Sequence, residues 1–183
     1  AGLAAAAAAA RSGDTIEIRG DGPFETPPVD LGTKALAIRA GDGCRPVLRL
    51  DVRRPTKGKA LLASRAPLVL EGVELQRLVD PDDGENLHAV VQAFGPFRMA
   101  NVRVVQTGNA QGVAVHCPDA GRHGPSEVVN SQLTTGWSAI DVWGREADSA
   151  LVVRNSICHG SAGVHVAIHY HLPKKLAVRL ERN

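Results

Sequence analysis

One short pattern of residues recurs along this chain, and it limits the possible folds more than any other feature. An alternating apolar run ends in Gly or Asn, and a second alternating run follows a few residues later. The clearest copies of the first run end at Gly72, Asn101, Asn130 and Asn155, spaced by 29 (101 − 72), 29 (130 − 101) and 25 (155 − 130) residues. A repeat of this length is typical of solenoids, in which each unit buries its apolar face only by stacking on its neighbours.

Further copies extend both series of runs. Weaker copies of the first run are Leu36–Ala40 and Leu176–Leu180, the latter with a register open by two or three residues. The second run recurs in four places, at Ala89–Ala93, Gly112–His116, Ala139–Trp143 and Gly163–Ala167. Matching these copies predicts one outward column, with spacings of 22 (114 − 92), 27 (141 − 114) and 24 (165 − 141), made of Gln92, Ala114, Asp141 and His165.

These patterns predict an all-β chain folded as a right-handed, single-stranded parallel β-helix. Alternation with period two indicates strands, and the short Gly, Asn and Pro segments between them leave no room for crossover helices. Only 3% of residues are aromatic, whereas 44% are hydrophobic, which suits many thin layers of aliphatic side chains. At the corners, Gly and Asn tolerate left-handed backbone angles, and an Asn amide can hydrogen-bond to the Asn one rung away. A β-sandwich is the alternative, but it would require hairpin turns rather than a periodic corner.

The chain divides into two parts by composition. Residues 1–12 are alanine-rich and predict a short N-terminal capping α-helix, and residues 13–183 predict a β-helix of about six to seven rungs. The segment 176–183 reads as a strand that no capping helix follows. An uncapped stack exposes backbone edges, so we expect a truncated β-helix whose C-terminal end is covered by further chain or by a partner.

The first rungs carry a family resemblance. The segments Gly13–Ile18, Gly22–Glu25 and Lys34–Ala40 resemble the start of the pectate-lyase-like superfamily, in which a capping helix leads into a GDTI strand. The resemblance implies the β-helix fold but no single activity, because lyases, hydrolases, esterases and adhesins share it. More narrowly, residues 13–24 resemble β-helix regions of planctomycete-type bacterial proteins, some of which also carry a kinase domain. The sequence contains no HRD, DFG or glycine-rich kinase motif.

Candidate catalytic residues gather late in the chain. A lyase site needs several carboxylates around calcium, but the predicted outward column supplies one, Asp141. A glycoside hydrolase needs paired carboxylates, for which Asp141 with Glu146 or Asp148 are the local candidates. Asp141 and His165 are expected on neighbouring rungs, about 5 Å apart, where a carboxylate could orient an imidazole. An exposed surface pair is the alternative interpretation.

Candidate ligand-binding residues lie on the same strands. The next outward positions are His116 and Trp143, and the Trp143 ring beside polar groups could stack against a sugar. Gln92 is the third candidate, two rungs earlier in the predicted column than Asp141.

Charge and cysteine content exclude several classes. The net charge is +2, from 21 basic and 19 acidic residues spread along the chain, which does not favour a nucleic-acid partner. The longest apolar stretch, Ala4–Ala10, is too short to insert into a membrane and lacks the features of a signal peptide. Cys44, Cys117 and Cys158 lack metal-binding spacing, so we expect neither a metal site nor a cofactor. An extracytoplasmic or cell-envelope location suits such a fold.

The functional expectation is therefore a non-catalytic module for binding or scaffolding. Its partner would be a polysaccharide, a cell-envelope component or a protein. The alternative is a carbohydrate-active enzyme, a lyase or a glycoside hydrolase, with its site around Asp141 and His165.

Overall fold

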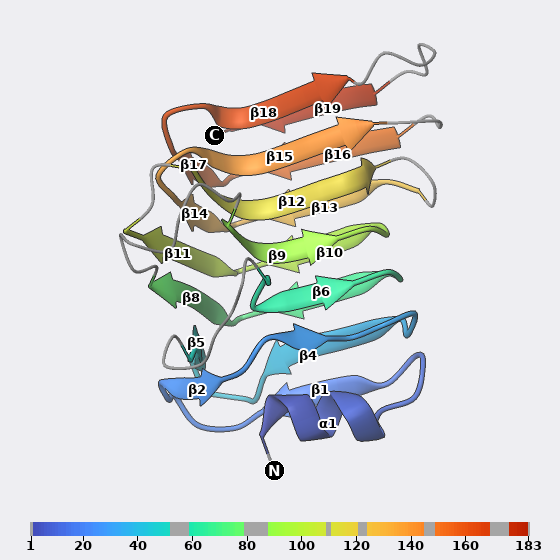
Figure 1. The fold of residues 1–183 in the computed structure, drawn as a ribbon, viewed down its shortest axis with the longest axis vertical. Coiled ribbons are helices and arrows are strands. Elements are labelled where there is room, and N and C mark those ends of the chain that lie inside the picture. Colours follow the sequence, from blue (N-terminus) through green and yellow to red (C-terminus); the bar gives the residue numbers. More distant parts are fainter. Residues whose placement is uncertain are drawn as a thin grey trace.

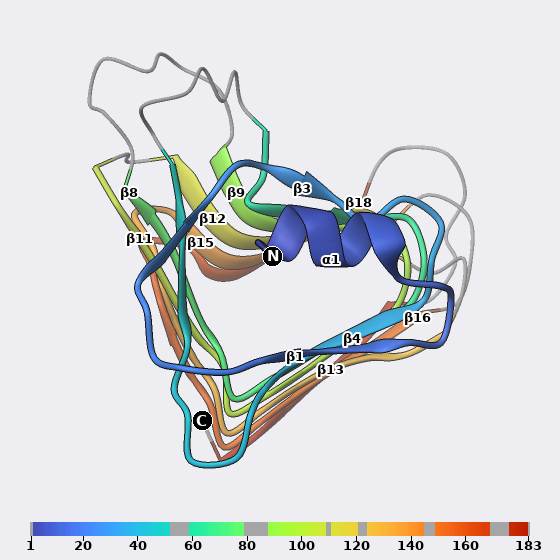
Figure 2. The ribbon, with the colours of Figure 1, turned by 90° about the horizontal axis from the view of Figure 1, so that it is seen from below.

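A computed structural model describes residues 2–51, 59–78, 88–108, 111–120, 124–144, 149–168 and 176–182 of the chain. One helix, α1 (Leu3–Ala9), precedes a stack of parallel strands (Figure 1). Seen from the N-terminal end, the chain runs clockwise as it recedes, so the coil is right-handed (Figure 2). The predicted fold, a right-handed parallel β-helix with an N-terminal helix, is confirmed.

Each complete rung contributes one strand to each of three parallel sheets. Within the described residues the sheets contain seven, six and six strands. Sheet A contains β1 (Thr15–Ile18), β4 (Leu36–Ala40), β7 (Leu68–Glu71), β10 (Phe97–Ala100), β13 (Ser126–Val129), β16 (Ser149–Arg154) and β19 (Leu176–Glu181). Sheet B contains β2 (Phe24–Thr26), β5 (Val47–Leu50), β8 (Glu74–Leu78), β11 (Arg103–Thr107), β14 (Gln132–Thr134) and β17 (Ile157–His159). Sheet C contains β3 (Val29–Asp30), β6 (Leu62–Ser64), β9 (His88–Ala93), β12 (Gly112–Ala120), β15 (Ser138–Gly144) and β18 (Gly163–Ile168).

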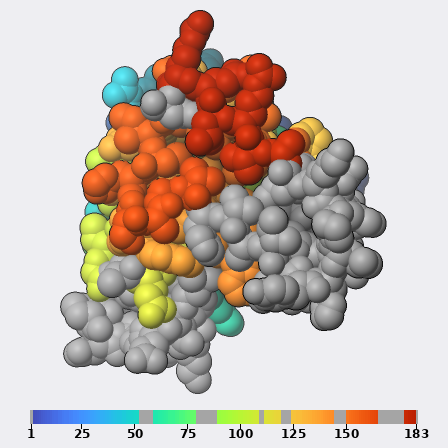
Figure 3. All heavy atoms as spheres, turned by 90° about the horizontal axis from the view of Figure 1, so that it is seen from above, coloured from blue at the N-terminus to red at the C-terminus, as the bar shows by residue number. Residues whose placement is uncertain are grey.

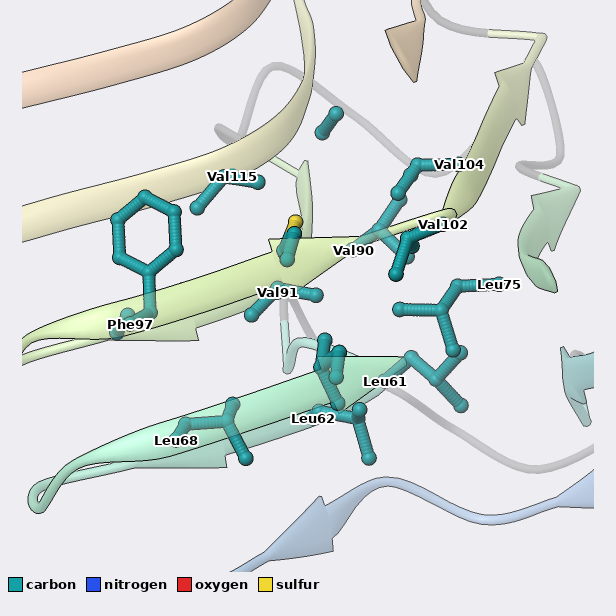
Figure 4. Close-up of a cluster of buried hydrophobic side chains, with 14 of the residues drawn as sticks. Leu61, Leu62, Leu68, Leu75, Val90, Val91, Phe97, Val102, Val104 and Val115 are labelled. Atoms are coloured by element: carbon teal, nitrogen blue, oxygen red, sulfur yellow. The ribbon is translucent and has the colours of Figure 1, made fainter. Parts of the chain in front are cut away.

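The core consists of aliphatic columns that run along the stack. In sheet A, the register places Ile38 against Leu70 and Leu70 against Met99, and all three side chains are fully buried. Figure 4 shows part of this core between the three sheets, where mainly Leu and Val side chains from successive rungs form one cluster. Each rung alone is a ring of short strands, so its apolar residues are removed from water by the rungs above and below.

The N-terminal helix closes the first rung. Leu3, Ala4 and Ala7 pack against the hydrophobic core, and the helix lies across the end of the stack (Figure 2). The Lys34 ammonium donates hydrogen bonds to the carbonyl oxygens of Ala7, Ala8 and Ala10 at 2.7, 3.1 and 3.0 Å. A cation at a helix C-terminus satisfies carbonyls that have no partner within the helix. No helix among the described residues is long and apolar enough to cross a membrane.

The corner between sheets A and B has the predicted backbone conformation. Gly72, Asn101, Asn130 and Asn155 all have positive φ angles, of 68°, 55°, 49° and 46°. The Asn155 side-chain amide donates to the Asn130 side-chain oxygen at 2.7 Å, which is the expected bond between rungs. Left-handed angles strain most residues that carry a Cβ, so this corner selects Gly and Asn.

Strand pairing determines the register of the last rung, which the sequence leaves open. Leu151 pairs with Val178 and Arg154 pairs with Glu181, so the last copy runs from Val178 to Arg182, two residues after Leu176–Leu180. Arg182 occupies the corner with a φ of 53°.

The last rung also differs from the others in its burial. Its inward positions Val178 and Leu180 are 38% and 58% exposed, whereas Leu151 and Val153 beneath them are 2% and 1% exposed. Figure 3 shows the red residues of β19 lying across this end of the stack.

Opposite charges pair between rungs on the outward face of sheet A. Arg39 lies 2.9 Å from Glu17, and Arg98 lies 3.1 Å from Glu127, which also contacts Arg154. Exposed pairs of this kind each contribute about 1 kcal/mol or less. Among the described residues, they pair positive with negative charge on this face.

The corner conformation leads to a first testable expectation. Asn130→Ala should lower the free energy of unfolding by about 1 to 2 kcal/mol, because alanine is strained at positive φ and cannot form the amide bond between rungs. Asn130→Gly should lose less than about 1 kcal/mol, because glycine adopts this conformation without strain. Urea denaturation measures both values. Equal losses for the two variants would contradict the role of the backbone angle.

Candidate functional site

Four polar residues form one column on the outward face of sheet C. The register places Gln92 beside His116, His116 beside Asp141, and Asp141 beside His165. The predicted neighbours Asp141 and His165 are therefore confirmed as backbone partners, but the His165 side chain lies outside the described part of the chain. The prediction that Ala114 belongs to this column is wrong. Ala114 lies two residues before His116 and is fully buried in the hydrophobic core.

His116 and Asp141 form a buried pair. The His116 Nδ1–H donates to Asp141 Oδ2 at 2.8 Å, since an ionised carboxylate only accepts hydrogen bonds. Asp141 is 0% exposed and His116 is 6% exposed. The sequence predicts an outward position for Asp141, and its side chain is buried there. The alternative interpretation, an exposed surface pair of Asp141 and His165, is therefore wrong for Asp141.

Trp143 completes this cluster, which we call the His116–Asp141–Trp143 cluster. Its ring meets the His116 ring edge to face, with centroids 5.4 Å apart and planes at 88°. Edge-to-face pairs of this kind contribute about 0.5 to 1.5 kcal/mol beyond burial. The Trp143 side chain is partly buried, so the pair holds its ring in place more than it presents an open stacking platform.

The inward neighbour of this cluster is a buried thiol. Cys117 follows His116 on β12, and burial, reinforced by the negative charge of Asp141, raises the pKa of its thiol far above the usual value. A thiol with a raised pKa is a poor nucleophile, so Cys117 acts as a small apolar residue. Burial also raises the pKa of Cys158.

The carboxylates of the predicted hydrolase site are not assembled by the described residues. Asp141 is the one carboxylate of the cluster whose side chain is described, and Glu146 and Asp148 lie outside the described residues. Among the described residues, no three His, Cys, Asp or Glu side chains lie together in a group that could hold a metal ion.

A second polar site follows the corner between sheets A and B, and we call it the corner trough. It consists of two adjoining open hollows of about 510 and 480 Å³ that share Asn101 and Arg103. In Figure 2 this corner lies where the strands of sheets A and B converge, close to the marked C-terminus. Its lining combines apolar surface, to which Cys44, Val73, Val102 and Ile157 contribute, with a row of polar side chains from Arg45, Glu74, Asn101, Arg103, Asn130, Gln132, Asn155 and Arg182.

Several polar groups of the corner trough remain available to a ligand. Within the described part of the chain, the side chains of Arg45, Asn101, Gln132 and Arg182 make no hydrogen bond or ion pair. Arg103 pairs with Glu74 at 3.2 Å, yet its side chain is 54% exposed. Amides and guanidinium groups can donate to hydroxyl or carboxylate oxygens. The trough therefore offers accessible donors, whereas the His116–Asp141–Trp143 cluster does not.

Sequence reasoning missed two sets of buried polar residues. Ser131 and Ser156 lie directly behind the corner, where Ser131 Oγ accepts from Val102 N and Ser156 Oγ accepts from Ser131 N, both at 3.1 Å. The repeated dipeptide Asn-Ser at 130–131 and 155–156 was the available signal. Arg77 is 1% exposed and donates to the carbonyl oxygens of Lys59 and Ala89 at 2.5 and 3.0 Å.

Comparisons with protein-family models, with curated proteins and with solved structures give no match to this chain.

Proposed function

We propose that this β-helix is a non-catalytic binding module that holds an extended polysaccharide along the corner trough. The carrying observation is the row of accessible amide and guanidinium groups that successive rungs place along one edge of the stack. Sugars present hydroxyl and carboxylate oxygens along their length, and fixed side-chain donors suit such a ligand.

The rigidity of the stack supports this proposal. The trough residues are held by parallel pairing on both sides, as in the neighbouring pairs β8–β11 and β11–β14. A preorganised row of groups binds with a smaller loss of conformational entropy than a flexible one. A module of this type acts by holding its ligand in place and requires no catalytic group.

We also propose that the chain belongs with the pectate-lyase-like superfamily. The support is the order of its first elements, in which α1 caps the first rung and leads into a strand at Thr15 within the Gly-Asp-Thr-Ile sequence. This relationship does not select an activity, since members of that superfamily differ in their sites.

A carbohydrate-active enzyme is the second candidate, and one observation favours it. The 2.8 Å bond between His116 and Asp141 is the arrangement in which a carboxylate orients a general base. Two points oppose the enzyme. Both side chains are almost completely buried. A glycoside hydrolase also requires a second carboxylate close to Asp141, and the described residues place none there.

The binding test uses soluble acidic and neutral polysaccharides in native affinity gels, with Arg103→Ala as the trough variant. We expect at least one polysaccharide to retard the wild-type protein, and Arg103→Ala to weaken that binding about tenfold, because a hydrogen bond to a charged group is lost. The matched control is Arg39→Ala, an exposed arginine on sheet A that forms an ion pair 2.9 Å long with Glu17.

Product analysis of the same mixtures separates the two candidates. The binding module should leave the chain length of every polysaccharide unchanged. Release of reducing ends or unsaturated sugars by the wild type, lost in Asp141→Asn, would replace the binding module by the enzyme. Binding that Arg39→Ala weakens as much as Arg103→Ala would exclude the corner trough as the site.

A further inference from the structure

The corner trough carries the same amide side chain in three successive rungs, at Asn101, Asn130 and Asn155. Gly72, Asn101, Asn130, Asn155 and Arg182 occupy equivalent positions with φ angles between 46° and 68°. Neighbouring strands of a sheet lie about 4.8 Å apart, so these positions form a nearly straight row with that repeat. All three Asn side chains are exposed. The corner thus presents three identical amides at equal intervals.

The three amides retain hydrogen-bonding capacity after their own contact. The Asn155 Nδ2 group donates to Asn130 Oδ1 at 2.7 Å, which leaves the amide nitrogen of Asn130 and the amide oxygen of Asn155 for a ligand. Asn101 makes no side-chain hydrogen bond to any described residue, so both of its polar atoms remain for a ligand. A sugar hydroxyl both donates and accepts hydrogen bonds, and each of these amides can therefore contact one.

From this repeat we infer that the ligand is a straight, β-1,4-linked polysaccharide that places one sugar at each rung. The inference rests on the proposed polysaccharide-binding function and adds the linkage. A β-1,4-linked chain of equatorially linked sugars is extended, and its advance per sugar is close to the rung spacing of about 4.8 Å. An α-1,4-linked glucan curves into a helix, so its sugars leave the row after a few residues. Only the extended chain can engage every rung at once, and linked contacts of this kind reinforce one another.

The corner also provides variants that change the number of amides in the row. Gly72 shows that glycine is accepted at this position, so Asn101→Gly, Asn130→Gly and Asn155→Gly remove one amide each without strain. Gly72→Asn should extend the row by one amide. Asn tolerates its positive φ, but the added Cβ would lie 3.2 Å from the Cβ of Ala40, so Ala40 must shift by a few tenths of an ångström to admit it.

The experiment measures the affinity of β-1,4-linked and α-1,4-linked glucose oligomers of two to seven sugars by titration calorimetry. These two series have the same composition and differ only in linkage. We expect the affinity for the β-linked series to rise with each sugar until the row is covered, and the α-linked series to show no such rise. Asn130→Gly should weaken the longest β-linked oligomer about fivefold, as the loss of one hydrogen bond predicts. Gly72→Asn should strengthen it.

The controls keep this inference separate from the proposed function. Arg98→Ala, on the face of sheet A, should bind as the wild type does, and thermal unfolding confirms that each variant is folded. Equal affinities for the two series, or an affinity that does not depend on length, would overturn the linkage while polysaccharide binding in the gels stands. Failure of every polysaccharide and oligomer to bind would overturn both.

Discussion

Replacing His116 by leucine is expected to lower the free energy of unfolding by about 3 to 5 kcal/mol, which is among the largest effects in this chain. The reason is the burial of its partner. Asp141 is 0% exposed, and the 2.8 Å bond from His116 Nδ1 stabilises its carboxylate inside the protein. Leucine fills much of the same space but cannot donate a hydrogen bond. Urea denaturation followed by circular dichroism measures the loss.

A double variant separates the charge from the packing. His116→Leu combined with Asp141→Leu removes both partners, and it should be more stable than His116→Leu alone, because no buried carboxylate then remains beside an apolar side chain. A loss below about 1 kcal/mol for His116→Leu would contradict the buried pair, since that is the size expected of exposed pairs.

Replacing Arg77 by methionine is expected to cost about 2 to 4 kcal/mol of stability. Arg77 is 1% exposed, and its guanidinium group donates to the carbonyl oxygens of Lys59 and Ala89. Methionine has a similar length but removes this donor from both carbonyl groups, of which the Ala89 contact is buried and the Lys59 contact is partly buried. The matched control is Arg39→Met, whose guanidinium is exposed and pairs with Glu17, and its loss should stay below about 1 kcal/mol. Equal losses at the two arginines would contradict a structural role for the buried one.

The corner could be predicted from the sequence because two independent signals coincide there. The period of the repeat defines the rung, and the backbone conformation restricts the corner to residues that accept positive φ, which explains Asn101, Asn130 and Asn155. Arg182 does not belong to this residue class, so the sequence alone leaves the register of the last rung open. Its position follows from the pairing of Arg154 with Glu181.

The polar column of sheet C was harder to predict because the strands depart from simple alternation. Val113, Ala114 and Val115 are all buried, and the pairing shifts between Ser138 and Ile140. Aligning His116 rather than Ala114 gives the more regular spacings 24 (116 − 92), 25 (141 − 116) and 24 (165 − 141), a signal that was present in the sequence.

The burial of Arg77 could be predicted from the strand pattern, whereas the burial of Asp141 could not. Alternation along β8 places Arg77 on the same side as Leu75, so its inward position was readable, although its carbonyl partners come from other strands. The burial of Asp141 depends on what packs over an outward face, and that is a property of the folded chain rather than of a local pattern. The corner trough likewise arises only when separate rungs stack.

The binding of a polysaccharide along the corner trough is tested most directly by the side-chain amide signals of Asn101, Asn130 and Asn155 in nitrogen-15 correlation spectra. Adding a β-1,4-linked glucose hexamer should shift all three signals together, with one dissociation constant, and leave the indole signal of Trp143 unchanged. Shifts confined to Trp143 and its neighbours, or no shift at any of the three amides at saturating ligand, would contradict the account.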